Sequence, residues 1–424
     1  MLITARASEL LLCRGALHSA VDWALRRGSL PLVKRASNPF TSRGRILTGK
    51  TPGSRLSCYL MIAMLLSLAV GWNSGDGPPS HDSAFTAERL LSAQASALKS
   101  TVVAATLTAP LEKGKNVMWC GTFQLAWNAA CDLVGEDLHF IPEPPVVAEL
   151  NQRTFVKSDL DEASYVALAD YVGRGIHGKI TQALQERFKG AAAPRSIPSE
   201  ALTPRPHDIV AYAYLFKNLE FATPFEQLDS TLWFGKQKVR ALGMDYPKFA
   251  QREMAQQVLI WHYQGSNNFV IELKSKSEGD RVILAKIQPK ATLAATVAEA
   301  QIRSNSGKPE IGMAGDELAI PKFNFDITQE YNELEGHLLV LKNPQVARDL
   351  QVQSAMQDLR FQMDERGARL RSDAHLALSC GVGSPPIRHV LFFDKPFLVM
   401  MEREKASAPY FALWVNNTEL LETN

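Results

Sequence analysis

The side chains that most often perform enzymatic chemistry are scattered along this chain. No two histidines lie three or four residues apart, as in a zinc-protease helix, and neither a Gly-x-Ser-x-Gly motif nor a glycine-rich phosphate loop occurs. The adjacent carboxylates Asp364 and Glu365 would point to opposite faces of a strand, so we expect a solvated strand end. His375 and His389 fit solvated loop histidines. These patterns favour a protein that is not an enzyme and that holds neither a metal nor a cofactor.

The most unusual segment is a long connection near the C-terminus. Between Gly367 and Pro396 it holds 28 residues, which is more than compact domains usually tolerate, so we expect it to be functional or mobile. Alternate residues are small or apolar, and those between them are mostly charged or polar. The first set is Ala368, Leu370, Ser372, Ala374, Leu376, Leu378 and Cys380, and the second is Arg369, Arg371, Asp373, His375, Ala377 and Ser379. This alternation favours a strand with one buried face, although the same residues could form a short helix.

The elements that must position this connection are helical in the first half of the body and extended in the second. The strand before it ends in the charged turn Asp364–Gly367, and two apolar strands joined by the polar turn Glu402–Ala408 follow it. Helices are expected at Phe85–Thr108, Asn116–Val134, Asp159–Phe188 (one or two, divided near Gly173), Thr292–Arg303 and in part of Glu330–Arg360, and strands from Ile209 to Pro289. Helices first and strands later predict an α+β domain.

The charge of the chain is unevenly distributed. Residues 1–55 carry ten Lys/Arg and two Asp/Glu, whereas the rest carries 36 basic and 42 acidic residues. The body is therefore mildly acidic and gives no electrostatic reason to expect nucleic-acid binding. We expect residues 1–55 to be an Arg-rich extension that is disordered or absent from the mature protein. That stretch also leaves open an organelle-type presequence or a start further downstream.

An apolar run, Leu56–Trp72, follows the extension and contains no charge. It is short for a membrane-spanning helix, which needs about 20 residues. It fits the core of a secretory signal with a small-residue cleavage site at Ala69-Val70-Gly71, so we expect secretion, with an uncleaved membrane anchor as the alternative. Residues 73–84 read as a Gly/Pro linker before a body at 85–424.

The cysteines do not indicate a disulfide framework. Cys120 and Cys131 are eleven residues apart, so on one helix they would lie about 16 Å apart, too far to form a bridge. We expect these two residues and Cys380 to be buried or free thiols.

Five motifs in series resemble the serpin family over roughly residues 85–424. Glu365-Arg366-Gly367 resembles the hinge of the reactive-centre loop, and Lys395-Pro396-Phe397 resembles a motif in the strands after it. The other three are Val210–Lys217 with Thr223-Pro224-Phe225, the hairpin from Gln257 to Leu273, and Ile320-Pro321-Lys322-Phe323. The resemblance implies a single domain with N-terminal helices, a large central β-sheet, further smaller sheets and a long exposed C-terminal loop.

The resemblance also implies a function, namely inhibition of a serine endopeptidase by loop cleavage and strand insertion. The hinge would comprise Glu365, Gly367, Ala368, Leu370, Ser372 and Ala374, the last four giving the inserting face, with the scissile bond at Gly381–Val382. Small residues there imply an elastase-type or subtilisin-type target. Burial of an unpaired charge costs several kcal/mol, and the inserting face carries none.

Three departures keep a non-inhibitory binding or structural role open as the alternative. The hinge carries the bulky Leu370 and two arginines, the family's Ser-Pro-x-Ser pattern is missing near Asn116–Phe123, and Phe221 stands where the family has Trp. In either case we expect a monomer whose only route to a membrane is the anchor at residues 56–72.

Overall fold

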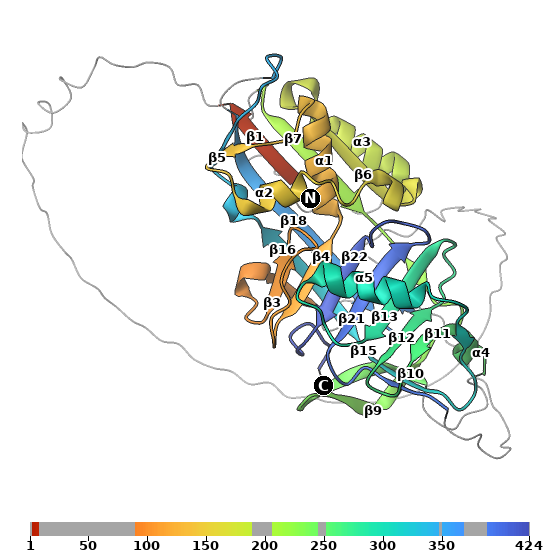
Figure 1. Cartoon of the computed structure of the whole chain (residues 1–424). Helices are drawn as coiled ribbons and strands as arrows, with labels where there is room; N and C mark the ends of the chain where they lie inside the picture. The colour runs from red at the N-terminus through yellow and green to blue at the C-terminus, as the bar shows by residue number, and fades with distance from the viewer. Residues whose placement is uncertain are drawn as a thin grey trace, which may run out of the picture. The chain divides into compact units, whose positions relative to one another are not determined.

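The computed structural model describes residues 2–7, 90–188, 206–244, 252–346, 350–368 and 388–423, with only the backbone of residues 2–7 and 229–231. These residues form an α+β fold built from three principal sheets and five α-helices (Figure 1). Buried residues from all three sheets belong to one continuous hydrophobic core. Among the described helices, none combines the length and the apolar character that crossing a bilayer requires.

The central sheet contains the longest strand of the described chain, β18 (Leu350–Met363). Its main strand order is β2-β16-β18-β1-β7-β6. The other strands in this order are β2 (Leu91–Gln94), β16 (Phe323–Glu330), β1 (Leu2–Ala7), β7 (Ile209–Leu215) and β6 (Tyr165–Tyr171). Two short strands, β5 (Phe140–Ile141) and β17 (Leu338–Leu339), extend the sheet. Strand β1 is antiparallel to both β18 and β7, so the start of the sequence forms an interior strand of this sheet (Figure 1).

The second sheet has the order β14-β11-β12-β13-β21-β22-β4-β3, and most residues of its interior strands are buried. Its strands are β14 (Glu310–Ile311), β11 (Val258–Tyr263), β12 (Phe269–Leu273), β13 (Asp280–Lys286), β21 (Phe397–Arg403), β22 (Phe411–Val415), β4 (Asn116–Cys120) and β3 (Thr101–Ala104). The third sheet has the order β20-β15-β10-β9. It comprises β20 (Val390–Phe392), β15 (Glu317–Pro321), β10 (Gln237–Met244) and β9 (Glu226–Phe234). A two-stranded pair joins β19 (Gly367–Ala368) to β8 (Leu219–Glu220).

Two helices cover the central sheet on opposite faces. Helix α1 (Thr122–Val134) is almost entirely buried and contacts β6, β7, β1 and β18. It ends at Gly135, whose φ of 80° is the left-handed conformation that glycine adopts without strain. Helix α3 (Ile176–Phe188) packs on the other face and forms a separate apolar cluster with β6 and β7. The remaining helices are α2 (Pro145–Leu150), α4 (Arg252–Gln256) and α5 (Leu293–Ser304).

Several predicted elements are confirmed. The two apolar strands around the turn Glu402–Ala408 are β21 and β22, and the strand before the charged turn is β18. The helix expected at Thr292–Arg303 is α5, whose N-cap Thr292 accepts a hydrogen bond from the backbone of Ala295. Strands dominate from Ile209 to Pro289, interrupted by the short α4.

Four predictions in the body need correction. Phe85–Thr108 is not a helix in its described part, because Leu91–Gln94 pairs with the sequence-distant β16 and Thr101–Ala104 pairs with the next strand, β4. The helix expected from Asn116 begins only at Thr122, since the residues before it form β4, which places Cys120 in a strand and Cys131 in a helix. In the segment from Asp159 only the second half is helical, and Tyr165–Tyr171 is a strand. The helical part expected in Glu330–Arg360 is a single short 3-10 turn, and Leu350–Arg360 is strand.

Candidate functional site: the hinge and the seam of the central sheet

The predicted hinge is a tight turn at the end of β18. The backbone N–H of Asp364 donates to the carbonyl of Gly367 at 3.1 Å, and the N–H of Gly367 donates back at 3.3 Å. The carboxylate of Asp364 accepts a 2.9 Å hydrogen bond from the N–H of Arg366. Burial raises the pKa of Asp364, although that hydrogen bond opposes the shift. The turn therefore reverses the chain onto the edge of β18.

Glu365 is held by a lysine that the sequence motif Ile320-Pro321-Lys322-Phe323 supplies. The Nζ of Lys322 lies 2.8 Å from Glu365 Oε2, and the side chain of Lys322 is only 7% exposed. Burial alone would raise the pKa of Glu365, but the hydrogen bond and charge of Lys322 outweigh it and hold the pKa below its usual value. The solvated strand end expected for Asp364 and Glu365 is therefore wrong, since both carboxylates have protein partners.

Gly367 is required by a close approach of two backbones. A Cβ at this position would lie 2.5 Å from the carbonyl oxygen of Leu219 and 2.8 Å from the Cα of Glu220. The contact is the β19–β8 pair, in which Gly367 lies opposite Glu220 and Ala368 opposite Leu219. A side chain would force these strands apart, so only glycine allows this pairing.

Backbone hydrogen bonds from the segment after β8 hold the other side of the turn. The N–H of Phe221 donates to the carbonyl of Arg366 at 2.8 Å, and the N–H of Phe225 donates to the carbonyl of Glu365 at 2.6 Å. Phe221, which stands where the family has Trp, is buried and meets Phe225 edge to face with ring centroids 5.1 Å apart. The hinge is thus fixed on both sides.

The hinge stands at one end of a seam between two strands. We define the seam as the line between β18 and the run formed by β7 and β8, Ile209–Glu220. At the hinge end, Gly367 and Ala368 are paired with β8. At the far end, β1 is paired with Leu350–Met356 of β18 and with Ile209–Tyr212 of β7 (Figure 1).

The two ends of the seam are in a common register. The pairing of Asp364 with Gly367, continued along β18, places position 375 opposite Met356. The pairing of Gly367 with Glu220, continued along β8 and β7, places position 375 opposite Tyr212. Leu2 occupies this position now, since it is paired with Met356 and with Tyr212. A strand continued from Ala368 would therefore need the six residues 369–374 to reach the position that Leu2 occupies.

A buried polar cluster fastens the middle of β18 to the layer beneath. The side-chain N–H group of Gln357 donates to Thr122 Oγ1 at 2.6 Å and to the carbonyl of Cys120 at 3.1 Å. Its oxygen accepts a 2.8 Å hydrogen bond from the hydroxyl of Tyr331. Thr122 begins α1 in the region that lacks the Ser-Pro-x-Ser pattern. Gln357 and Thr122 therefore connect β18 to α1 directly below the seam.

No protein-family model matches this chain, and no curated protein matches it. Among solved structures it is similar to Serpin48 of the insect Tenebrio molitor, with 13% identity, a TM-score of 0.42 and coverage of 72% of this chain and 92% of that one. It is also similar to thyroxine-binding globulin in complex with thyroxine, with 12% identity, a TM-score of 0.40 and coverage of 72% and 93%. For human kallistatin the identity is 13%, the TM-score 0.40 and the coverage 71% and 91%.

The chain has a serpin-like fold. The arrangement of the elements carries this statement: the hinge motif ends the longest central strand, and the chain returns through β20 into the third sheet and through β21 and β22 into the second. The similarities to solved structures are too distant to support any statement about activity.

The structure describes only part of the predicted site. Glu365, Gly367 and Ala368 lie together at the hinge. Leu370, Ser372, Ala374 and the predicted scissile pair Gly381 and Val382 lie outside the described residues, as do His375 and the segment 56–72. Sequence reasoning missed Gln357 and the strand Leu2–Ala7, and it quoted Lys322 only as part of a motif.

The serpin-like loop re-enters the fold beside a histidine. His389 Nδ1 lies 2.9 Å from Asp316 Oδ1, and the His389 side chain is only 12% exposed. Its ring meets that of Tyr263 edge to face at 4.6 Å, and the Tyr263 hydroxyl accepts a hydrogen bond from the N–H of Val390. The expectation of a solvated His389 is therefore wrong, since this residue anchors the start of β20.

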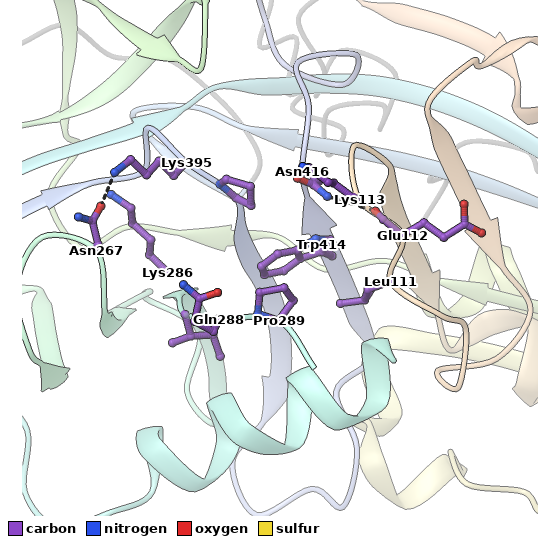
Figure 2. A pocket seen from close by; sticks show the side chains of 12 residues that line it. Leu111, Glu112, Lys113, Asn267, Lys286, Gln288, Pro289, Lys395, Trp414 and Asn416 are labelled. Atoms are coloured by element: carbon purple, nitrogen blue, oxygen red, sulfur yellow. Dashed lines mark hydrogen bonds between the residues drawn. The ribbon is translucent and has the colours of Figure 1, made fainter. Parts of the chain in front are cut away.

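Away from the hinge, the described residues line a pocket of about 610 Å³ beside Pro396 and Trp414 (Figure 2). Two of the lysines that line the pocket bind protein groups: Lys395 Nζ donates to Asn267 Oδ1 at 2.9 Å, and Lys286 Nζ donates to Asp394 and to two backbone carbonyls. Among the described residues, no group of three or more His, Cys, Asp or Glu could hold a metal ion.

Cys120 and Cys131 are buried free thiols, and burial raises the pKa of Cys131 to about 11.

Proposed function

We propose that this serpin-like protein inhibits a serine endopeptidase through cleavage of its loop and insertion of the cleaved strand into the seam. The observation that carries the proposal is the β19–β8 pair, because Gly367 and Ala368 already lie as an added strand at the hinge end. A strand continued beyond Ala368 in the direction of the Asp364–Gly367 pair would run along the edge of β18, antiparallel to it.

The register gives the inserting residues the correct face. Continued along β18, it sets Leu370 opposite Phe361, Ser372 opposite Leu359 and Ala374 opposite Gln357. All three partners are buried on the core side of the sheet. Directly opposed residues of antiparallel strands share one face, so the uncharged set would enter the core. Of the alternate residues, Arg371 and Asp373 would lie opposite the partly exposed Arg360 and Asp358. Arg369 would lie opposite Gln362, which is buried.

The length of β18 matches the length of the loop up to the predicted scissile bond. Strand β18 has 14 residues. In the same register, an inserted loop would set Ala368 opposite Met363 and Gly381 opposite Leu350, at the other end of β18. A loop cut at Gly381–Val382 would therefore pair along the whole of β18, which would gain backbone hydrogen bonds and buried apolar area.

The trapping step follows from the chemistry of acyl transfer. The serine oxygen of the protease attacks the carbonyl carbon of Gly381, and the bond to the nitrogen of Val382 breaks, with the serine proton transferred to that nitrogen. Insertion of residues 369–381 would carry the acylated protease away before water cleaves the ester. Such a mechanism spends free energy stored in the uncleaved fold.

A non-inhibitory binding role is the second candidate. The pairing of Leu2–Ala7 with both sides of the seam favours it, because those residues occupy part of the path that a loop would take. The bulky Leu370 and the two arginines would also slow insertion, and a slow trap is hydrolysed as a substrate.

The test is incubation of the full chain with an elastase-type or subtilisin-type serine protease. We expect a covalent complex that survives denaturing electrophoresis and a new N-terminus between residues 381 and 384. Cleavage there without any complex would support the non-inhibitory role.

We further propose that the protein acts as a secreted monomer, with an anchor formed by residues 56–72 as the alternative. Size-exclusion chromatography of culture medium and of membrane fractions tests the oligomeric state and the location.

A further inference from the structure

A strand from the start of the sequence lies within the seam. Leu2–Ala7 pairs with β18 from Met356 to Leu350 and with β7 from Tyr212 to Ile209. It has the orientation in which residues of the cleaved loop would enter, and Leu2 lies where position 375 would lie; its register against β18 shifts by one residue between Thr4 and Ala5. Its backbone serves as the fourth strand of the main order of the sheet.

We propose that the far half of the seam is a binding site for an extended peptide strand and that this chain fills it with its own residues Leu2–Ala7. Because an interior strand hydrogen-bonds on both edges, occupancy would protect the backbone of β18 and β7 at once. The site is defined by Leu350–Met356 and Ile209–Tyr212, and any peptide able to pair with both would compete for it.

The surroundings suit a strand that enters from outside. Helix α1 contacts β1, β7 and β18 on one face. On the other face, Met356 of β18 packs against the cluster that α3 forms with Tyr212. The strands on both sides of Leu2 therefore have packed layers beside them.

Competition with the loop is a consequence that rests on the proposed function. Loop positions 369–374 would enter the seam without meeting β1, whereas positions 375–381 would need the partners that Leu2–Ala7 now holds. Removal of the N-terminal segment, for example by cleavage at the predicted site Ala69-Val70-Gly71, would then let the whole loop from 369 to 381 enter the seam, and not only positions 369–374.

The test uses hydrogen–deuterium exchange of the full, uncleaved chain, so it does not depend on inhibition. One variant, Ile3→Pro with Thr4→Pro, removes two backbone donors of the strand. The matched control, Ile3→Ala with Thr4→Ala, retains them. In the unmutated chain we expect slow exchange at Ile3–Ala7, at Leu350–Met356 and at Ile209–Tyr212. The proline variant should exchange about 100-fold faster at all three, because a proline within a strand disrupts its ladder, whereas the control should not.

A second readout separates loss of the strand from loss of the fold. In the proline variant, exchange at β12 and β13 should remain slow, and the added peptide Leu-Ile-Thr-Ala-Arg-Ala should restore protection at Leu350–Met356. Fast exchange of Ile3–Ala7 in the unmutated chain, or unchanged protection of both strands in the proline variant, would overturn the proposal. Failure of protease trapping alone would leave it standing and would refute the proposed function instead.

Discussion

The substitution Leu370→Arg tests the face assignment of the loop, with Arg369→Ala as its matched control. The register places position 370 opposite Phe361, whose ring centroid lies 4.7 Å from that of Phe411 and 5.7 Å from that of Phe323. On the other side of the seam it lies opposite Lys217, whose side chain is 8% exposed and bound to Asp280 at 2.8 Å. An arginine at position 370 would enter an aromatic cluster next to a buried cation.

The magnitude follows from two contributions. Loss of a buried leucine forfeits about 1.5–3 kcal/mol, and burial of an unpaired guanidinium costs several kcal/mol more. A total of about 5 kcal/mol corresponds to about 10 °C in Tm, since 1 kcal/mol shifts the Tm of a domain of this size by roughly 2 °C. Arg369→Ala removes a charge from the face away from Phe361 and buries no new polar group, so it should change little.

The assay compares the Tm of each variant before and after cleavage in the loop between Cys380 and Ser384. The unmutated chain and Arg369→Ala should gain stability on cleavage, and Leu370→Arg should lose about 10 °C of that gain. Equal effects of the two substitutions would refute the face assignment. An unchanged gain in Leu370→Arg would show that position 370 does not enter the core.

Three further predictions concern the hinge and the layer below it. Gly367→Ala should separate β19 from β8, because its Cβ would lie 2.5 Å from a backbone oxygen, and faster exchange at residues 366–368 would show this. Gln357→Ala should lower stability by about 1–3 kcal/mol, because the buried hydroxyl of Tyr331 loses its 2.8 Å bond to Gln357 and keeps only the 3.5 Å contact with the carbonyl of Ala104; urea denaturation measures the loss, and an unchanged midpoint would contradict it. Because the folded-state pKa of Glu365 is lowered, the stability from its pairing with Lys322 is present above the unfolded-state pKa and is lost as pH falls through the folded-state pKa. Lys322→Met should therefore lower the Tm at pH 7 more than at pH 3, and equal losses at both pH values would contradict the pairing.

Local patterns predicted the C-terminal half of the fold well and the N-terminal half less well. The turn Glu402–Ala408 and the run into Asp364 carry their own signals, since a short polar segment between apolar strands specifies a hairpin. Around Leu91, helical spacing of apolar residues coincided with two strands: Leu91–Gln94 pairs with Phe325–Thr328, far away in the sequence, and Thr101–Ala104 pairs with Asn116–Trp119. Such pairing overrides local propensity and leaves no local trace.

The same reasoning explains what was missed at the site. The turn that holds Asp364 is bound by backbone hydrogen bonds from Phe221 and Phe225, and neither segment alone indicates that contact. The strand Leu2–Ala7 is short and lies in a region whose composition indicates an extension rather than a sheet. Its partners Met356 and Tyr212 are far away in the sequence, so only the assembled sheet shows where it binds.

The measurement that tests the central claim most directly is hydrogen–deuterium exchange of the full chain before and after cleavage between Cys380 and Ser384. Insertion predicts stronger protection at Gln357–Met363 and at residues 213–218, the stretch of the seam between its two paired ends. This gain is expected whether or not Leu2–Ala7 stays in place, because positions 369–374 enter ahead of it. Complete cleavage with unchanged exchange in both stretches would contradict strand insertion as the function of this loop.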